Sequence, residues 1–179
     1  TICDIINLNY QVVKTKDKDL REGDYMKEYE YDEINNDLDI PGVWALWGKD
    51  KKTSKKTCLE VAQTENILSE IKSALYILSH EDDEECKKCC EIYNARKREE
   101  FSKDFKVHKC KTCEHVSEIR TLSWKRNPRY IDKYRDISLE YKDMEIVVLN
   151  DSLNIRDRNL RCKMEKAYAE INKAKYWYS

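Results

Sequence analysis

Apolar residues recur along much of this chain at the three- and four-residue spacing of an amphipathic helix. The first stripe of this kind comprises Val61, Leu68, Ile71, Leu75 and Leu78. Thr57 and Glu60 precede it with the spacing of a capping box, which predicts that a helix begins there. The sequence therefore predicts a helix from about residue 57 to residue 80.

Two longer stripes occupy the second half of the chain. They are Tyr130, Tyr134, Ile137, Tyr141, Met144 and Val148, then Leu160, Met164, Ala167, Ile171, Ala174 and Tyr178. Pro128 precedes the first of them and suits the first turn of a helix. Shorter helical patterns run from about 84 to 107 and from 114 to 124. Stripes at this spacing are typical of helices that pack antiparallel.

The predicted fold class is all-α, an elongated, disulfide-stapled antiparallel bundle in a single domain of residues 1–179. Only three glycines and two prolines are present, so few positions favour tight turns. Residues 1–56 show the least regular pattern, with Pro41-Gly42 interrupting a polar stretch. We therefore expect an irregular N-terminal part, 1–56, followed by a helical bundle, 57–179.

Charge and composition exclude several classes of function. The 34 Lys and Arg nearly balance 35 Asp and Glu, which argues against a nucleic-acid partner bound through phosphate contacts. No apolar run approaches the roughly 20 residues of a membrane span, so this fragment is not expected to insert into a membrane. Phosphate-binding loops, nucleophile elbows and metalloprotease motifs are missing from the sequence. These features predict a protein that is not an enzyme and needs no cofactor.

Eight cysteines are the main chemical signal, and two interpretations of them stay open. An even total suggests disulfides that link helices in an oxidising compartment. Cys58 and Cys162 lie on other predicted helices and are natural partners for the cluster at 86–90. The predicted disulfide cysteines are Cys3, Cys58, Cys86, Cys89, Cys90, Cys110, Cys113 and Cys162.

The alternative interpretation is a zinc site. Cys86-x2-Cys89 and Cys110-x2-Cys113 have the spacing of four-cysteine sites, and His108 and His115 flank the second pair. No glycine follows either pair, and the intervening segment has a helical pattern. This alternative predicts an intracellular helical zinc protein with a role in nucleic-acid or regulatory interactions.

The segment Cys86-Lys-Lys-Cys89-Cys90-Glu-Ile-Tyr93, followed by Lys97-Arg-Glu-Glu-Phe101, resembles a motif of malaria-parasite adhesins. The family comprises the Duffy-binding-like domains and the cysteine-rich interdomain regions. Trp44-Ala-Leu-Trp47 is similar to the paired-Trp segment that precedes the motif. The resemblance implies an extracellular, helical, disulfide-bonded ectodomain that binds a host-cell surface protein without catalysis.

The densest basic and aromatic segment surrounds Pro128. Aromatic and Arg side chains dominate the energetics of protein interfaces. Because Pro128 forces a bend, we expect an exposed corner there that contacts a partner. The candidate binding residues are Trp124, Arg126, Arg129, Tyr130 and Tyr134.

Overall fold

The computed structural model describes residues 10–14, 36–80, 83–98, 110–120 and 128–177. The chain divides into two compact units. The first, which we call the sheet unit, consists of residues 1–71 and 140–179. The second, the helical unit, consists of residues 72–139 and is an insertion within the first.

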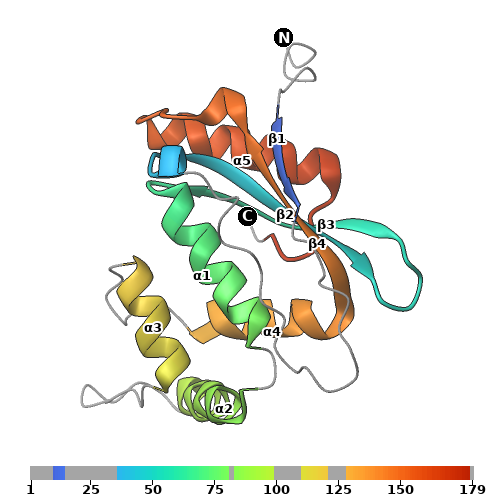
Figure 1. Cartoon of the computed structure of the whole chain (residues 1–179), viewed down its shortest axis with the longest axis vertical. Coiled ribbons are helices and arrows are strands. Elements are labelled where there is room, and N and C mark those ends of the chain that lie inside the picture. The colour runs from blue at the N-terminus through green and yellow to red at the C-terminus, as the bar shows by residue number, and fades with distance from the viewer. Residues whose placement is uncertain (1–9, 15–35, 81–82, 99–109, 121–127, 178–179) are drawn as a thin grey trace. The chain divides into compact units, whose positions relative to one another are not determined.

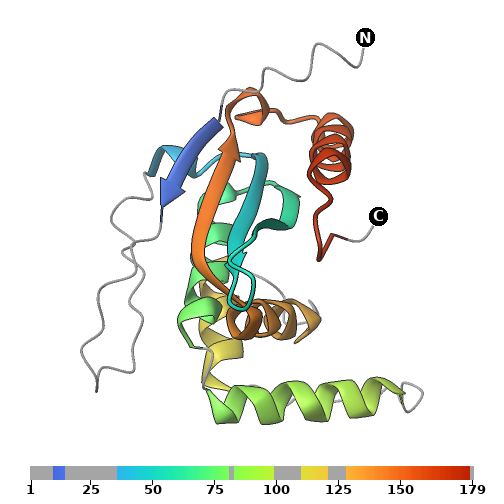
Figure 2. The ribbon, with the colours of Figure 1, turned by 90° about the vertical axis from the view of Figure 1, so that its right-hand side faces the viewer.

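An antiparallel sheet forms the sheet unit (Figure 1). Its strands, in the spatial order β1-β4-β2-β3, are β1 (Tyr10–Lys14), β4 (Tyr141–Leu149), β2 (Gly42–Asp50) and β3 (Lys56–Thr64). Short 3-10 helices lie at Asn36–Leu38 and Asn150–Ser152. Helix α5 (Arg158–Asn172) packs on one face of the sheet, against β3 and β2 (Figure 2).

The sheet is buried on both faces, which explains its sequence pattern. Val43, Ala45 and Val147 face α5, together with Ala169 of that helix. On the opposite face Trp44 lies across from Val148. A strand buried on both faces appears in the sequence as a continuous apolar run and not as an alternation. Val43-Trp-Ala-Leu-Trp47 is such a run.

The all-α prediction is therefore wrong, and two predicted helical segments are strands. Residues 56–64 form β3, so Thr57 and Glu60 do not cap a helix. The stripe that begins at Tyr130 also changes structure partway, because α4 ends at Glu140 and β4 begins at the next residue. The consecutive β-branched residues Ile146, Val147 and Val148 favour that strand.

The four other helices are α1 (Ile67–Ser79), α2 (Glu84–Arg98), α3 (Lys111–Arg120) and α4 (Pro128–Glu140). Helix α1 begins in the sheet unit and continues into the helical unit. Pro128 is the first residue of α4, as its preference for the first turn predicts. Across the ranges that the structure describes, no helix combines the length and the apolar character needed to cross a membrane.

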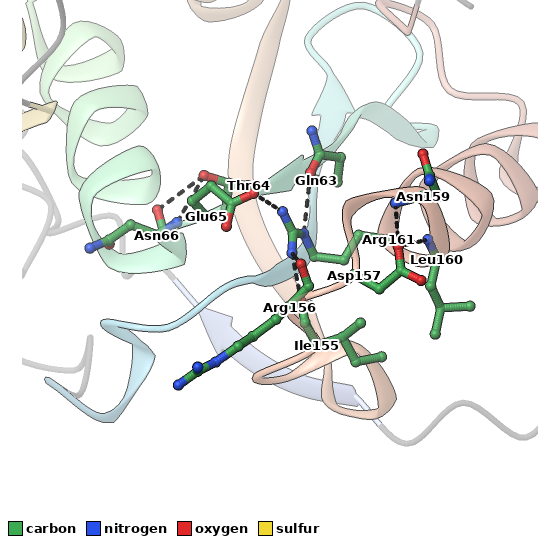
Figure 3. A network of polar contacts seen from close by, with 10 residues as sticks. All are labelled: Gln63, Thr64, Glu65, Asn66, Ile155, Arg156, Asp157, Asn159, Leu160 and Arg161. Atoms are coloured by element: carbon green, nitrogen blue, oxygen red, sulfur yellow. Dashed lines mark hydrogen bonds and ion pairs between the residues drawn. The ribbon is translucent and has the colours of Figure 1, made fainter.

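A fully buried arginine ties the start of α5 to the end of β3 (Figure 3). Nη1 of Arg161 donates to the carbonyl oxygens of Ile155 and Arg156 at 2.6 and 3.0 Å. Its Nε donates to Gln63 at 3.2 Å, and its Nη2 pairs with Glu65. Each of the three guanidinium nitrogens thus has an oxygen partner, which offsets the free-energy cost of burying the charge.

Candidate metal centre

Cysteine sulfurs from two helices gather at one point of the helical unit. The Sγ atoms of Cys89, Cys110 and Cys113 all lie within 4.8 Å of one another, close enough to bind one metal ion together. Sγ of Cys113 lies 3.8 Å from that of Cys89 and 3.4 Å from that of Cys110. The Cys86 thiol also contacts those of Cys110 and Cys113, although it is not one of the three mutually close sulfurs. These are the four cysteines of the predicted zinc site.

Each cysteine pair lies in the N-terminal part of its helix. Cys86 and Cys89 follow the start of α2 at Glu84, and Cys110 immediately precedes α3. The Cys110 sulfur accepts a hydrogen bond from the backbone N–H of Cys113 at 3.5 Å, as an N-cap side chain does. A helix N-terminus favours negative charge, so this placement stabilises thiolates.

Asp83 fixes the two helix starts relative to each other. One of its carboxylate oxygens accepts from the backbone N–H of Cys86 at 2.9 Å, which caps α2. The other accepts from the Thr112 hydroxyl in the first turn of α3. Thr112 is itself buried. The first turns of α2 and α3 are therefore joined through one carboxylate beside the sulfurs.

The thiols differ strongly in acidity. Hydrogen-bonding contacts with the Cys113 and Cys86 thiols hold the pKa of Cys110 well below its usual range. Contact with Cys110 is the largest cause that raises the pKa of Cys86 and of Cys113. The group thus favours a first thiolate at Cys110 and disfavours loss of a proton from Cys86 or Cys113. A bound cation would stabilise the additional thiolates.

Arg135 also borders the site, and no feature of the sequence pattern pointed to it. Arg135 of α4 is buried, and its Nη2 lies 2.8 Å from the Cys86 sulfur and 3.8 Å from the Cys90 sulfur. Its Nη1 pairs with Asp132 at 3.1 Å. Hydrogen bonds from Cys86, and then from Arg135, lower the pKa of Cys90. Spacing along one chain gives no signal for a contact between residues 86 and 135.

The histidines are not part of the sulfur group in the described structure. His115 lies with its Nδ1 3.9 Å from Glu118, and its ring contacts that of Tyr76 at 4.2 Å between centroids. His80 bonds through Nδ1 to the Tyr76 carbonyl at 2.7 Å. His108 lies outside the described residues.

The remaining cysteines lie apart from this group. Cys58 is in the core of the sheet unit, where burial raises the pKa of its thiol to about 12, and Cys162 is exposed on α5. Cys3 lies outside the described residues. Among the described cysteines, Cys58, Cys86, Cys90, Cys110 and Cys162 are not joined in disulfides. The disulfide network stays a prediction.

The structure places the residues of the predicted binding corner in different environments or does not describe them. Tyr134 is fully buried, so it cannot contribute to an exposed patch. Trp124 and Arg126 lie outside the described residues, while Arg129 and Tyr130 belong to the first turn of α4. The structure therefore leaves a smaller candidate surface than the sequence suggested.

Comparison with known proteins does not assign the chain to a family. No family model matches the sequence, and neither a curated protein nor a solved structure matches it. The resemblance to the malaria adhesins stays a prediction. The helical fold that it implied is contradicted by the sheet.

Proposed function

We propose that this protein is a non-catalytic zinc-binding protein, in which one Zn²⁺ held by Cys86, Cys89, Cys110 and Cys113 organises the helical unit as a scaffold for macromolecular interactions. The observation that carries the proposal is the convergence of these sulfurs. Four sulfurs at about 2.3 Å from a central ion, at tetrahedral angles, lie about 3.8 Å apart. The separations of 3.4 Å between Cys110 and Cys113 and of 3.8 Å between Cys89 and Cys113 are close to that value.

The spacing also favours a single ion over a cluster. An iron–sulfur cluster places several metal ions and inorganic sulfides between its cysteine ligands, so those ligands must be further apart. Four thiolates around one ion are typical of structural zinc. Such a site is closed and offers no open position to a substrate, which supports a structural role.

The packing of the first part of α2 supports a structural metal. Among the residues of α2 whose side chains are described, 84–91, the buried ones are Cys86, Cys89 and Cys90. That stretch contains no Leu, Ile or Val. The inner face of α2 over residues 84–91 therefore consists of sulfur, and apolar burial in this part of the helix provides little attachment. A metal bound through that face supplies the missing free energy.

Location and partner follow from the chemistry of the site. Thiolate ligands persist in a reducing compartment, so the proposed zinc protein is intracellular. Its partner is a protein or another macromolecule bound by the helical unit without dominant phosphate contacts, because the net charge is −1. Binding to a host-cell surface protein stays a prediction of the adhesin resemblance.

The proposal is tested by the metal content of the full chain. Protein purified without chelators should contain about one zinc per chain by elemental analysis. The double variant Cys110→Ser/Cys113→Ser should contain none, because it removes half of the ligands. Cys162→Ser is the matched control, since this exposed cysteine lies outside the group and its loss should leave the zinc in place.

Reduced, metal-free wild type provides a second measurement that does not depend on the folding of the variant. Titration with Zn²⁺ should reach an end point at one equivalent and should protect four thiols from alkylation. A chain that binds no zinc under these conditions contradicts the proposal. So does native protein whose intact mass shows these four cysteines paired in disulfides.

A further inference from the structure

The site contains more sulfur than a tetrahedral ion can use. Five cysteines, Cys86, Cys89, Cys90, Cys110 and Cys113, meet or border it, whereas a structural zinc takes four. Three of them are mutually close. The fourth ligand must come from α2, where Cys86 and Cys90 are both 1% exposed.

Helix geometry and contacts show which of these two sulfurs is better placed to be the fourth ligand. At about 100° per residue, Cys86 lies about 60° from Cys89 around the helix axis, while Cys90 lies about 100° from it. The Cys86 thiol contacts Cys110 and Cys113 of the other helix. The Cys90 thiol contacts Cys86 and Arg135. Cys86 thus contacts the two cysteines at the start of α3, whereas the contacts given for Cys90 are with Cys86 and Arg135.

Arg135 of α4 contacts the sulfurs of both Cys86 and Cys90. Nη2 of Arg135 is 2.8 Å from the Cys86 sulfur and 3.8 Å from that of Cys90. Its side chain is 8% exposed, and Asp132 pairs with its other nitrogen at 3.1 Å. Four thiolates and one Zn²⁺ carry a net charge of −2. A guanidinium that donates to one of the thiolates reduces this excess of negative charge and fixes the ligand's orientation.

We propose that Arg135 is the positioning residue of the metal centre. It holds Cys86 as the fourth ligand by donating a hydrogen bond to its sulfur, and it keeps Cys90 outside the coordination sphere. The inference rests on the proposed zinc site. It adds the outer contact that decides which α2 cysteine binds the ion.

Arg135→Met tests the contact, because Met keeps much of the apolar stem and removes the donor. Its zinc affinity, measured by competition with a chromophoric chelator, should fall about 10- to 100-fold. Arg135→Lys should recover part of that loss because a cation remains. Lys88→Met is the matched control, since it removes an exposed cation beside Cys89 and should keep wild-type affinity.

Cobalt loading reports which sulfurs bind, through the intensity of the sulfur-to-cobalt charge-transfer band. Cys90→Ala should keep the four-thiolate spectrum and the affinity. Cys86→Ala should bind more weakly, with a spectrum of fewer thiolates. Arg135→Met should shift the band, because the hydrogen bond to the Cys86 sulfur is lost. A general loss of packing would lower the amount of protein that loads cobalt but would not shift the band of the protein that does.

The outcomes separate this inference from the proposed function. Wild-type affinity and spectrum in Arg135→Met, with zinc present in wild type, overturn the inference and leave the zinc site standing. Loss of a thiolate in Cys90→Ala but not in Cys86→Ala reverses the ligand assignment and also overturns it. If wild type binds neither zinc nor cobalt, both proposals fail. The cysteine variants decide the ligand question even if Arg135→Met fails to fold.

Discussion

Each of the two units contains a buried arginine, and the partners of these arginines differ. In the sheet unit, Arg161 donates to the carbonyls of Ile155 and Arg156 and to the side-chain oxygen of Gln63. In the helical unit, Arg135 points one nitrogen at Asp132 and the other at cysteine sulfurs. Arg161 is satisfied by oxygens that are present in any state of the protein. Arg135 is best satisfied when the sulfurs carry negative charge.

The same difference extends to the packing around them. The sheet unit buries Trp44, Leu46 and Ile146 on one face of the sheet and a second apolar cluster under α5. The first turns of α2 and α3 bury mainly cysteines. An apolar core is stable without a ligand, whereas a sulfur core requires an ion to hold its anionic form together. We therefore expect the packing of α2 and α3 to depend on metal and the sheet unit to be independent of it.

Metal removal should produce the largest difference between the units. Chelation of the full chain under reducing conditions should increase amide exchange across α2 and α3 by at least about 100-fold, on the order of 3 kcal/mol of local opening free energy. Amides of β2 and β4 should keep their protection, because their ladder and core contain no ligand. Hydrogen exchange with mass spectrometry checks this, and re-addition of zinc should restore the protection. Equal loss of protection in both units would contradict the comparison.

Substitution of the other arginine should have a smaller effect that does not depend on metal. Arg161→Met leaves the carbonyls of Ile155 and Arg156 without their donor, which should lower the free energy of unfolding by about 2–3 kcal/mol. Denaturant unfolding with and without zinc should give the same loss. Arg158→Met, at the exposed first residue of α5, is the control and should change stability little. A loss that appears only without zinc would show that the units are not independent.

The helices that could be predicted are those with an amphipathic stripe and a clear boundary. Pro128 begins α4 as expected, and α5 covers the last stripe as far as Ile171 but ends at Asn172, before Ala174. The sheet was missed because its strands are buried on both faces and lack the alternation of a half-exposed strand. The spacing of Tyr141, Met144 and Val148 continued the helical pattern into β4. The β-branched run at 146–148 was the signal that distinguishes the two.

The site was only partly visible in the sequence. Its four cysteines were identified as an alternative, since their spacing is a local property. Two features of the sequence counted against it, the missing glycines and the helical pattern between the pairs. The structure shows that the first turn of α3 supplies a backbone N–H to the Cys110 sulfur, so no glycine turn is needed there. The role of Arg135 depends on the packing of α4 against α2, which the pattern along one chain does not reveal.

X-ray absorption at the zinc edge of the full chain tests the central claim most directly. The account predicts a first shell of four sulfurs at about 2.3 Å and no nitrogen or oxygen ligand. Cys162→Ser should give the same shell, because the exposed Cys162 is not a ligand. A shell that contains nitrogen or oxygen, or a chain that carries no zinc because its cysteines are oxidised, would contradict the four-thiolate site.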